Sequence, residues 1–119
     1  MHQGIILLAH GSRDPLWKRP IEAVATQVRE QAPNILVSCA YIELTEPDLL
    51  QCATNLITQG ANSIRVFPMF LGIGKHARDD IPLQMEQVKK LHPDIIFELL
   101  PTAGECEELT ALLAQLALR

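Results

Sequence analysis

The sequence predicts a three-layer α/β domain in which four parallel strands alternate with four helices. Four short apolar runs, each typical of a strand buried on both faces, are separated by stretches with helical periodicity. The length of 119 residues corresponds to a single domain, residues 1–119, that can bury a substantial core. The chain shows no linker, repeat or low-complexity segment. Strands that alternate with helices in this way form a parallel sheet with right-handed crossovers.

The first strand–helix unit opens with the apolar run GIILLA at residues 4–9. Residues 10–18 are then expected to form a long loop, and a helix is expected to begin near Arg19. Pro20 fixes that boundary, because a proline is tolerated in the first turn of a helix but breaks its interior.

The second unit has a strand at residues 35–42, followed by a helix that ends at Gly60. Thr45 and Asp48 have the spacing of a capping box, and Pro47 suits a first helical turn. Gly60 is expected to terminate the helix as a glycine C-cap.

The third and fourth units complete the sheet. A strand at residues 63–70 is followed by a glycine-marked loop that carries His76, and then by a helix over about residues 80–91. Residues 94–100 form the fourth strand and residues 105–118 the last helix. That helix is expected to turn one apolar stripe toward the core, made of Leu109, Leu112, Leu113 and Leu116.

The expected strand order is 2-1-3-4, the flavodoxin-like arrangement, in which ligands bind at the carboxyl ends of strands 1 and 3. His10 and His76 follow those two strands, while Glu43 and Glu46 follow strand 2 at the same edge. Two imidazoles and a carboxylate suit a divalent cation such as Co²⁺, Ni²⁺, Fe²⁺ or Zn²⁺, or proton transfer near neutral pH. The alternative is that each histidine makes only local hydrogen bonds.

Basic residues gather around the same two loops. Their concentration in an acidic protein indicates an anionic ligand with several carboxylates or phosphates, although solvated loop charges would look the same. Trp17 is expected to form an apolar wall of the same cleft. Five of the ten Lys and Arg residues lie there, namely Arg13, Lys18, Arg19, Lys75 and Arg78.

Composition excludes several classes of partner. The net charge of −4 argues against nucleic-acid binding, which needs a basic face. No apolar run reaches transmembrane length and no signal-peptide pattern opens the chain, so no membrane contact is expected. The three cysteines are odd in number and scattered, which is typical of reduced thiols in a cytoplasmic protein.

The glycine-marked segment at residues 69–77 resembles two nucleotide-binding motifs. A Walker A loop requires glycine where Met69 stands and serine or threonine where His76 stands, so it is excluded. The pattern Gly72-x-Gly74-x-x-Ala77 does satisfy a relaxed dinucleotide fingerprint, with Glu98 as its acidic residue. It follows the third strand rather than the first, so dinucleotide binding stays a minor alternative.

Three stretches, each at or after the carboxyl end of an expected strand, carry a family resemblance. They are HGSR at residues 10–13, YIE with EP at residues 41–43 and 46–47, and FPMFLGIGKHARDDIP at residues 67–82. In combination they resemble the CbiX family in its short form, the class II chelatases that insert a metal into sirohydrochlorin. The resemblance extends to the last helix, where residues 100–105 also fit.

The resemblance implies a chelatase-like domain, half of a larger chelatase architecture, that pairs as a homodimer. It places the metal-site histidines on His10 and His76, and one of them or Glu43 would take protons as the base. The metal would be a substrate, first of all Co²⁺, with Fe²⁺ or Ni²⁺ as alternatives. No organic cofactor and no iron–sulphur cluster are expected. Residues 104–107 read GECE where the family often has Gly-Glu-His-Pro, so no third histidine carries over.

Sirohydrochlorin carries many carboxylates, so the resemblance implies that Ser12, Arg13, Lys75 and Arg78 bind the substrate. The predicted function is therefore a metallochelatase that acts on sirohydrochlorin in tetrapyrrole and cobalamin biosynthesis. The competing hypothesis is a non-catalytic module of the same fold that carries a metal or a tetrapyrrole.

Overall fold

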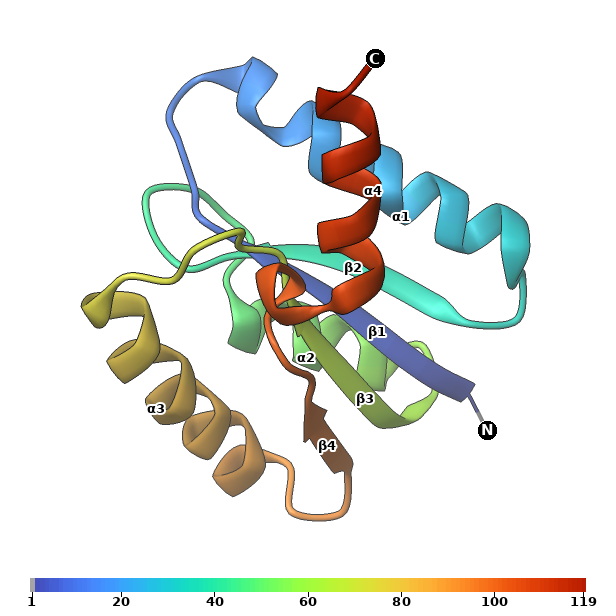
Figure 1. Cartoon of the computed structure of the whole chain (residues 1–119). Helices are drawn as coiled ribbons and strands as arrows, with labels where there is room; N and C mark the ends of the chain where they lie inside the picture. The colour runs from blue at the N-terminus through green and yellow to red at the C-terminus, as the bar shows by residue number, and fades with distance from the viewer. Residues whose placement is uncertain (1) are drawn as a thin grey trace.

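A four-stranded sheet forms the centre of the structure, a computed structural model that describes residues 2–119. The strand order is β2-β1-β3-β4 and all neighbours are parallel, which confirms the predicted order (Figure 1). The strands are β1 (His2–Ala9), β2 (Leu36–Tyr41), β3 (Ala61–Pro68) and β4 (Ile96–Leu99).

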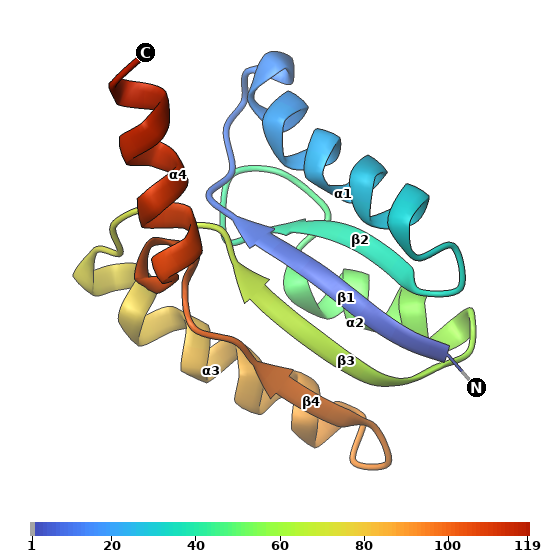
Figure 2. The same cartoon turned by 45° about the vertical axis from the view of Figure 1, so that its right-hand side comes forward.

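Helices cover the sheet unequally. On one face, α2 packs against β1, β2 and β3 and α3 lies beside it toward β4, while α1 lies over β1 and β2 on the other face (Figure 2). The fourth helix, α4, covers neither face. The helices are α1 (Arg19–Gln31), α2 (Leu49–Thr58), α3 (Lys75–Leu91) and α4 (Glu107–Ala117), with 3₁₀ turns η1 (Pro15–Lys18) and η2 (Ala103–Glu105).

The continuous apolar run in β1 is buried on both faces, as predicted. Ile6 and Leu8 point into the core beneath α2 and α3, whereas Leu7 packs against α1. All three are nearly or fully buried, and each such side chain contributes about 1.5–3 kcal/mol of transfer free energy. This central strand ends at Ala9, so His10 emerges at its carboxyl end.

The helix boundaries of the first half are confirmed at α1 and corrected at α2. Helix α1 begins at Arg19 with Pro20 in its first turn, although the predicted loop before it contains the short turn η1. The capping box of α2 is formed by Asp48 and Gln51, not by Thr45 and Asp48. Thr45 cannot take that role because its backbone N–H is bonded to the carbonyl of Glu43 in the preceding turn.

Pro47 precedes the N-cap of α2 and so lies outside the first helical turn, which corrects a second expectation for this segment. At the other end of α2, Gly60 has φ of 110°, a left-handed conformation that only glycine adopts freely. The glycine termination of α2 is therefore confirmed.

Helix α3 begins at Lys75, five residues before the predicted start at Asp80, so His76 lies in a first helical turn and not in a loop. The reason is packing: Ala77 is buried one turn before Ile81 and extends the apolar stripe of the helix backward. Burial of that stripe outweighs the cost of Pro82 inside the helix, which is about 3 kcal/mol or more.

The expectation that α4 turns its leucine stripe toward the core is wrong. None of the residues of α4 is buried, and Leu112 and Leu116 are 49% and 45% exposed. Within residues 2–119, no helix is long and apolar enough to cross a membrane.

Two weakly acidic groups between α1 and β2, the half-buried Cys39 thiol and the buried Tyr41 hydroxyl, predict a pH dependence of stability. Burial, with a further contribution from Glu22, raises the pKa of the Cys39 thiol to about 11, and burial raises the pKa of Tyr41 to about 12. Raised pKa values favour the folded state while these groups are neutral. The contribution of Cys39 to the free energy of unfolding is fully present below its unfolded pKa of 9.0. It is lost as the pH rises through the folded pKa of about 11.

The free energy of unfolding, measured by urea titration, should therefore fall as the pH is raised from about 9 to about 11. A Cys39→Ala variant should show a shallower fall, because the fall then rests on Tyr41 and on the buried Cys52 thiol, whose pKa burial also raises. An unchanged slope in that variant would contradict the assignment to Cys39.

Candidate metal-binding site

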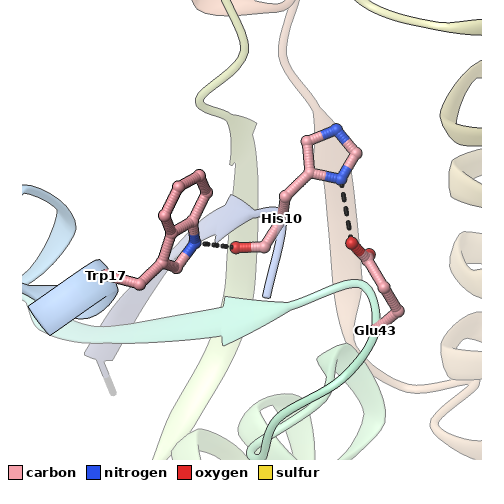
Figure 3. A network of polar contacts seen from close by, with 3 residues as sticks. All are labelled: His10, Trp17 and Glu43. Carbon is pink, nitrogen blue, oxygen red and sulfur yellow. Dashed lines mark hydrogen bonds and ion pairs between the residues drawn. The ribbon is translucent and has the colours of Figure 1, made fainter. Parts of the chain in front are cut away.

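The carboxyl ends of β1 and β2 bring two predicted site residues into contact. The Nδ1 of His10 lies 3.1 Å from Oε1 of Glu43, and the two side chains are 47% and 42% exposed (Figure 3). When Nδ1–H donates to the carboxylate, the lone pair of His10 Nε2 stays free to bind a cation. The predicted proximity of Glu43 to the His10 loop is confirmed.

Two aromatic side chains fix His10 further. Its ring meets the buried Phe70 edge to face, with centroids 4.7 Å apart and planes at 63°. The indole N–H of Trp17 donates to the backbone carbonyl of His10 at 2.6 Å (Figure 3). Trp17 was expected only as an apolar wall, and the sequence holds no signal for this polar role.

The loops that carry His10 and Glu43 pack backbone to backbone. A Cβ on Gly11 would lie 1.7 Å from the carbonyl oxygen of Glu43, so no other residue fits there without movement. Leu44 has φ of 70°, and the N–H of Thr45 bonds across it to the Glu43 carbonyl. Such backbone strain costs about 1–3 kcal/mol and persists where surrounding contacts enforce it. Sequence reasoning did not single out Gly11.

The second predicted ligand, His76, is exposed in the first turn of α3, which follows β3 at the same edge of the sheet. Within residues 2–119 its side chain makes no hydrogen bond, and no hydrogen bond or ring contact joins His10 to His76. Nor do residues 2–119 contain a group of three or more His, Cys, Asp or Glu side chains arranged to hold a metal. A metal held jointly by His10 and His76 stays a prediction.

The basic residues near the histidines divide into two groups. Arg13, Lys75 and Arg78 are exposed, and none of them forms an ion pair with another described residue. They remain available to an anionic ligand. Ser12, also predicted to bind substrate, accepts a hydrogen bond from the backbone N–H of Asp14.

Lys18 is already engaged within the chain. Its Nζ donates to the backbone carbonyl of Glu46 at 3.1 Å and lies 5.1 Å from the centre of the Tyr41 ring. The Glu46 carboxylate accepts from the amide of Gln51 at 3.4 Å, away from His10. Of the two candidate carboxylates, only Glu43 contacts a histidine.

The structure does not favour a dinucleotide site at the glycine-marked loop. A Cβ on Gly72 or Gly74 would meet no atom within 4 Å, so neither glycine is required by local packing. The acidic residue needed for a dinucleotide site, Glu98, is paired with Arg65 at 3.1 Å across the sheet.

Comparison with known proteins identifies relatives of the whole fold. The family model CbiX matches residues 4–119. A crystal structure of a CbiX protein from Marinobacter aquaeolei VT8 superposes with a TM-score of 0.84 at 32% identity, covering 97% of this chain and 93% of that one. The sirohydrochlorin chelatase SirB from Bacillus subtilis, in complex with cobalt, gives 0.81 at 25% identity and covers 97% and 49%.

Sequence relatives carry a related name. Proteins called sirohydrochlorin cobaltochelatase are 35% identical over 80 residues in Methanococcus aeolicus and 32% identical over 95 residues in Sulfolobus acidocaldarius. These alignments cover 67% and 80% of this chain. They span 56% of the first relative and 76% of the second.

Proposed function

Because the chain belongs to the CbiX family, we propose that it is a chelatase that inserts a divalent metal, first of all Co²⁺, into sirohydrochlorin. In this proposal residues 1–119 act as one chelatase-like domain, in the cytoplasm and in tetrapyrrole and cobalamin biosynthesis. The relatives named sirohydrochlorin cobaltochelatase and the cobalt complex of SirB support the choice of substrate and metal. The observation that carries the proposal is the His10–Glu43 pair at the edge of the sheet.

The chemistry demands a metal ligand and a base in one place. As the cation enters the ring, two pyrrole N–H bonds break and two protons leave, so the charge of the ring and ion together is balanced. His10 presents Nε2 to the metal while Glu43 holds its Nδ1–H. Once the cation has passed to the macrocycle, the freed Nε2 can accept one pyrrole proton, and the Glu43 carboxylate stabilises the resulting imidazolium. His76, in the first turn of α3, is the second proposed ligand and base.

We propose that substrate is bound by three cations that form no ion pair with another described residue. Arg13, Lys75 and Arg78 would pair with carboxylates of sirohydrochlorin, with Ser12 as a further polar contact beside His10. The macrocycle is broad and flat, and it is too large to be enclosed by the rim of one small domain. We therefore place two copies of the chain around it as a homodimer.

The test is a multiple-turnover insertion assay followed by the absorption spectrum of the ring. Purified protein should insert Co²⁺ well above the uncatalysed rate, whereas a non-catalytic carrier would bind both substrates without accelerating the reaction.

Replacing Lys75 and Arg78 together with glutamine should raise KM several-fold at similar kcat, because binding contacts are lost. Competition among Co²⁺, Fe²⁺ and Ni²⁺ in this assay identifies the preferred metal. The identity of the ligands alone does not determine it, because metal selection in the cell also depends on which ions are supplied.

A further inference from the structure

A polar pocket, the α1–β2 pocket, lies between helix α1 and the edge strand β2, which run alongside each other (Figure 2). Its volume is about 400 Å³, within the usual range of small-molecule sites. None of its described lining residues has a role in the proposed metal insertion. Its lining includes Lys18, Glu22, Arg29, Cys39, Tyr41 and Pro47.

One buried side chain of this pocket lacks a hydrogen-bond partner. Tyr41, the last residue of β2, is 1% exposed. Within residues 2–119 its hydroxyl is the one buried side-chain oxygen or nitrogen without a partner. Buried hydroxyls are nearly always hydrogen-bonded, because leaving one unpaired costs free energy. Burial raises the pKa of Tyr41 to about 12, so the hydroxyl keeps its proton near neutral pH and can donate to an acceptor.

Two cations line the same pocket. The Nζ of Lys18 lies 5.1 Å from the centre of the Tyr41 ring and donates to the Glu46 carbonyl at 3.1 Å. The Nη2 of Arg29 donates to the Val37 carbonyl at 3.3 Å. An ammonium group carries three N–H donors and a guanidinium five, so both cations keep further donors after these bonds.

The charge of the pocket favours an anion. Lys18 and Arg29 oppose a single carboxylate, that of Glu22, so the lining carries one net positive charge. Within residues 2–119 none of these three side chains forms an ion pair. Carboxylate and phosphate oxygens accept hydrogen bonds from cations and from neutral hydroxyls, so either group matches this set of donors.

An added β-strand fits this place less well, although the pocket borders an edge strand. The carbonyl of Val37 accepts from the side chain of Arg29, and the N–H of Tyr41 donates to the Pro47 carbonyl at 2.9 Å. These bonds occupy groups at the edge of β2 that a pairing strand would need. The pocket is therefore better suited to a small molecule.

We propose that the α1–β2 pocket binds a small organic anion through a carboxylate or phosphate group, which accepts hydrogen bonds from the Tyr41 hydroxyl and the Lys18 ammonium. Because the hydroxyl is buried, the anion reaches it when a neighbouring side chain moves. Lys18 lies over the ring on a flexible four-carbon stem, and its rotation away from the Glu46 carbonyl opens this wall of the pocket.

Titration of the full chain with inorganic phosphate and, separately, with sodium acetate tests the site. The measurement is the ¹⁵N–¹H NMR spectrum, with the ionic strength held constant by sodium chloride. Saturable shifts of the Lys18 and Tyr41 amides with either probe support the proposal, and the tighter probe identifies the preferred group. If neither probe shifts these amides, the proposal is overturned.

Two substitutions assign the binding to this pocket. Tyr41→Phe removes only the hydroxyl, and Lys18→Gln removes the charge of the second donor. Each should raise the dissociation constant of the bound probe about tenfold or more, because a hydrogen bond to a charged group is lost. Lys89→Gln is the matched control, since Lys89 is exposed in the last turn of α3 and its loss changes the net charge equally.

The control should bind the probe as tightly as the parent chain. Equal weakening in Lys89→Gln would show that the anion only screens the charge of the protein, which overturns the proposal. Unchanged binding in both Tyr41→Phe and Lys18→Gln overturns it as well.

Urea unfolding distinguishes a ligand site from a contact within the chain. Since the hydroxyl has no partner among residues 2–119, Tyr41→Phe should be at least as stable as the parent chain without added anion. The parent should gain more stability than the variant when the anion is added. A variant that is clearly less stable in anion-free buffer would show that the hydroxyl is bonded within the chain or to a trapped water, and would overturn the proposal. None of these measurements uses a metal or a macrocycle, so their outcome is independent of the proposed function.

Discussion

Replacing either His10 or His76 with alanine should lower the rate of metal insertion by about 100-fold or more. Both substitutions remove an imidazole that is proposed to present the metal and accept a pyrrole proton, and proton transfer by a positioned side chain contributes about 10²–10⁴-fold. For His10 the loss also frees Glu43, whose carboxylate would have no histidine partner. The measurement is kcat in the insertion assay with Co²⁺.

His92→Ala is the matched control for these variants. His92 caps the far end of α3 and bonds to Thr54 at 3.2 Å, at the opposite edge of the sheet. It should insert metal at the unaltered rate. The far-UV circular dichroism of all three variants should match that of the parent chain. Full activity in both His10→Ala and His76→Ala would show that the metal site lies elsewhere.

Gly11→Ala should destabilise the fold and reduce insertion together. The new Cβ would lie 1.7 Å from the Glu43 carbonyl oxygen and 3.1 Å from Cγ2 of Thr45, so the two loops must separate. Forcing a group into a packed position costs about 1–3 kcal/mol, and more where backbone must move. Moving the loop that carries Glu43 also lengthens its contact with His10. Urea unfolding and kcat measure the two effects.

Gly72→Ala provides the same chemical change at a position without constraint. A Cβ there has no atom within 4 Å and the backbone φ is not in the left-handed region, so stability and activity should be nearly unchanged. Equal effects of the two substitutions would mean that loss of glycine flexibility, and not the contact with Glu43, is responsible.

The sheet and the core were predictable because their signals are local. The run GIILLA could be buried only in the centre of a parallel sheet, and β1 occupies that place. The start of α3 was predicted at Asp80 and not at Lys75, although Ala77 already continues the spacing of Ile81 and Met85. That spacing was the signal that could have corrected it.

The site was predictable as far as strand order determines it. The order 2-1-3-4 places the loops after β1 and β2 side by side, and the contact between His10 and Glu43 follows from it. The close packing of Gly11 against Glu43 depends on the conformation of two loops. The hydrophobic periodicity of the sequence predicts helices and strands but not loop conformations. The uncovered stripe of α4 was missed for a different reason: periodicity identifies an apolar face but not which chain covers it.

Trp17 has a practical consequence as the only tryptophan of the chain. Its indole is bonded through Nε1–H to the His10 carbonyl and is 46% exposed, so the tryptophan fluorescence of the protein, excited selectively at wavelengths that Tyr41 does not absorb, arises from one fluorophore beside His10 at the candidate site. The emission of the unlabelled chain therefore reports on the loop that carries His10, and on nothing more distant.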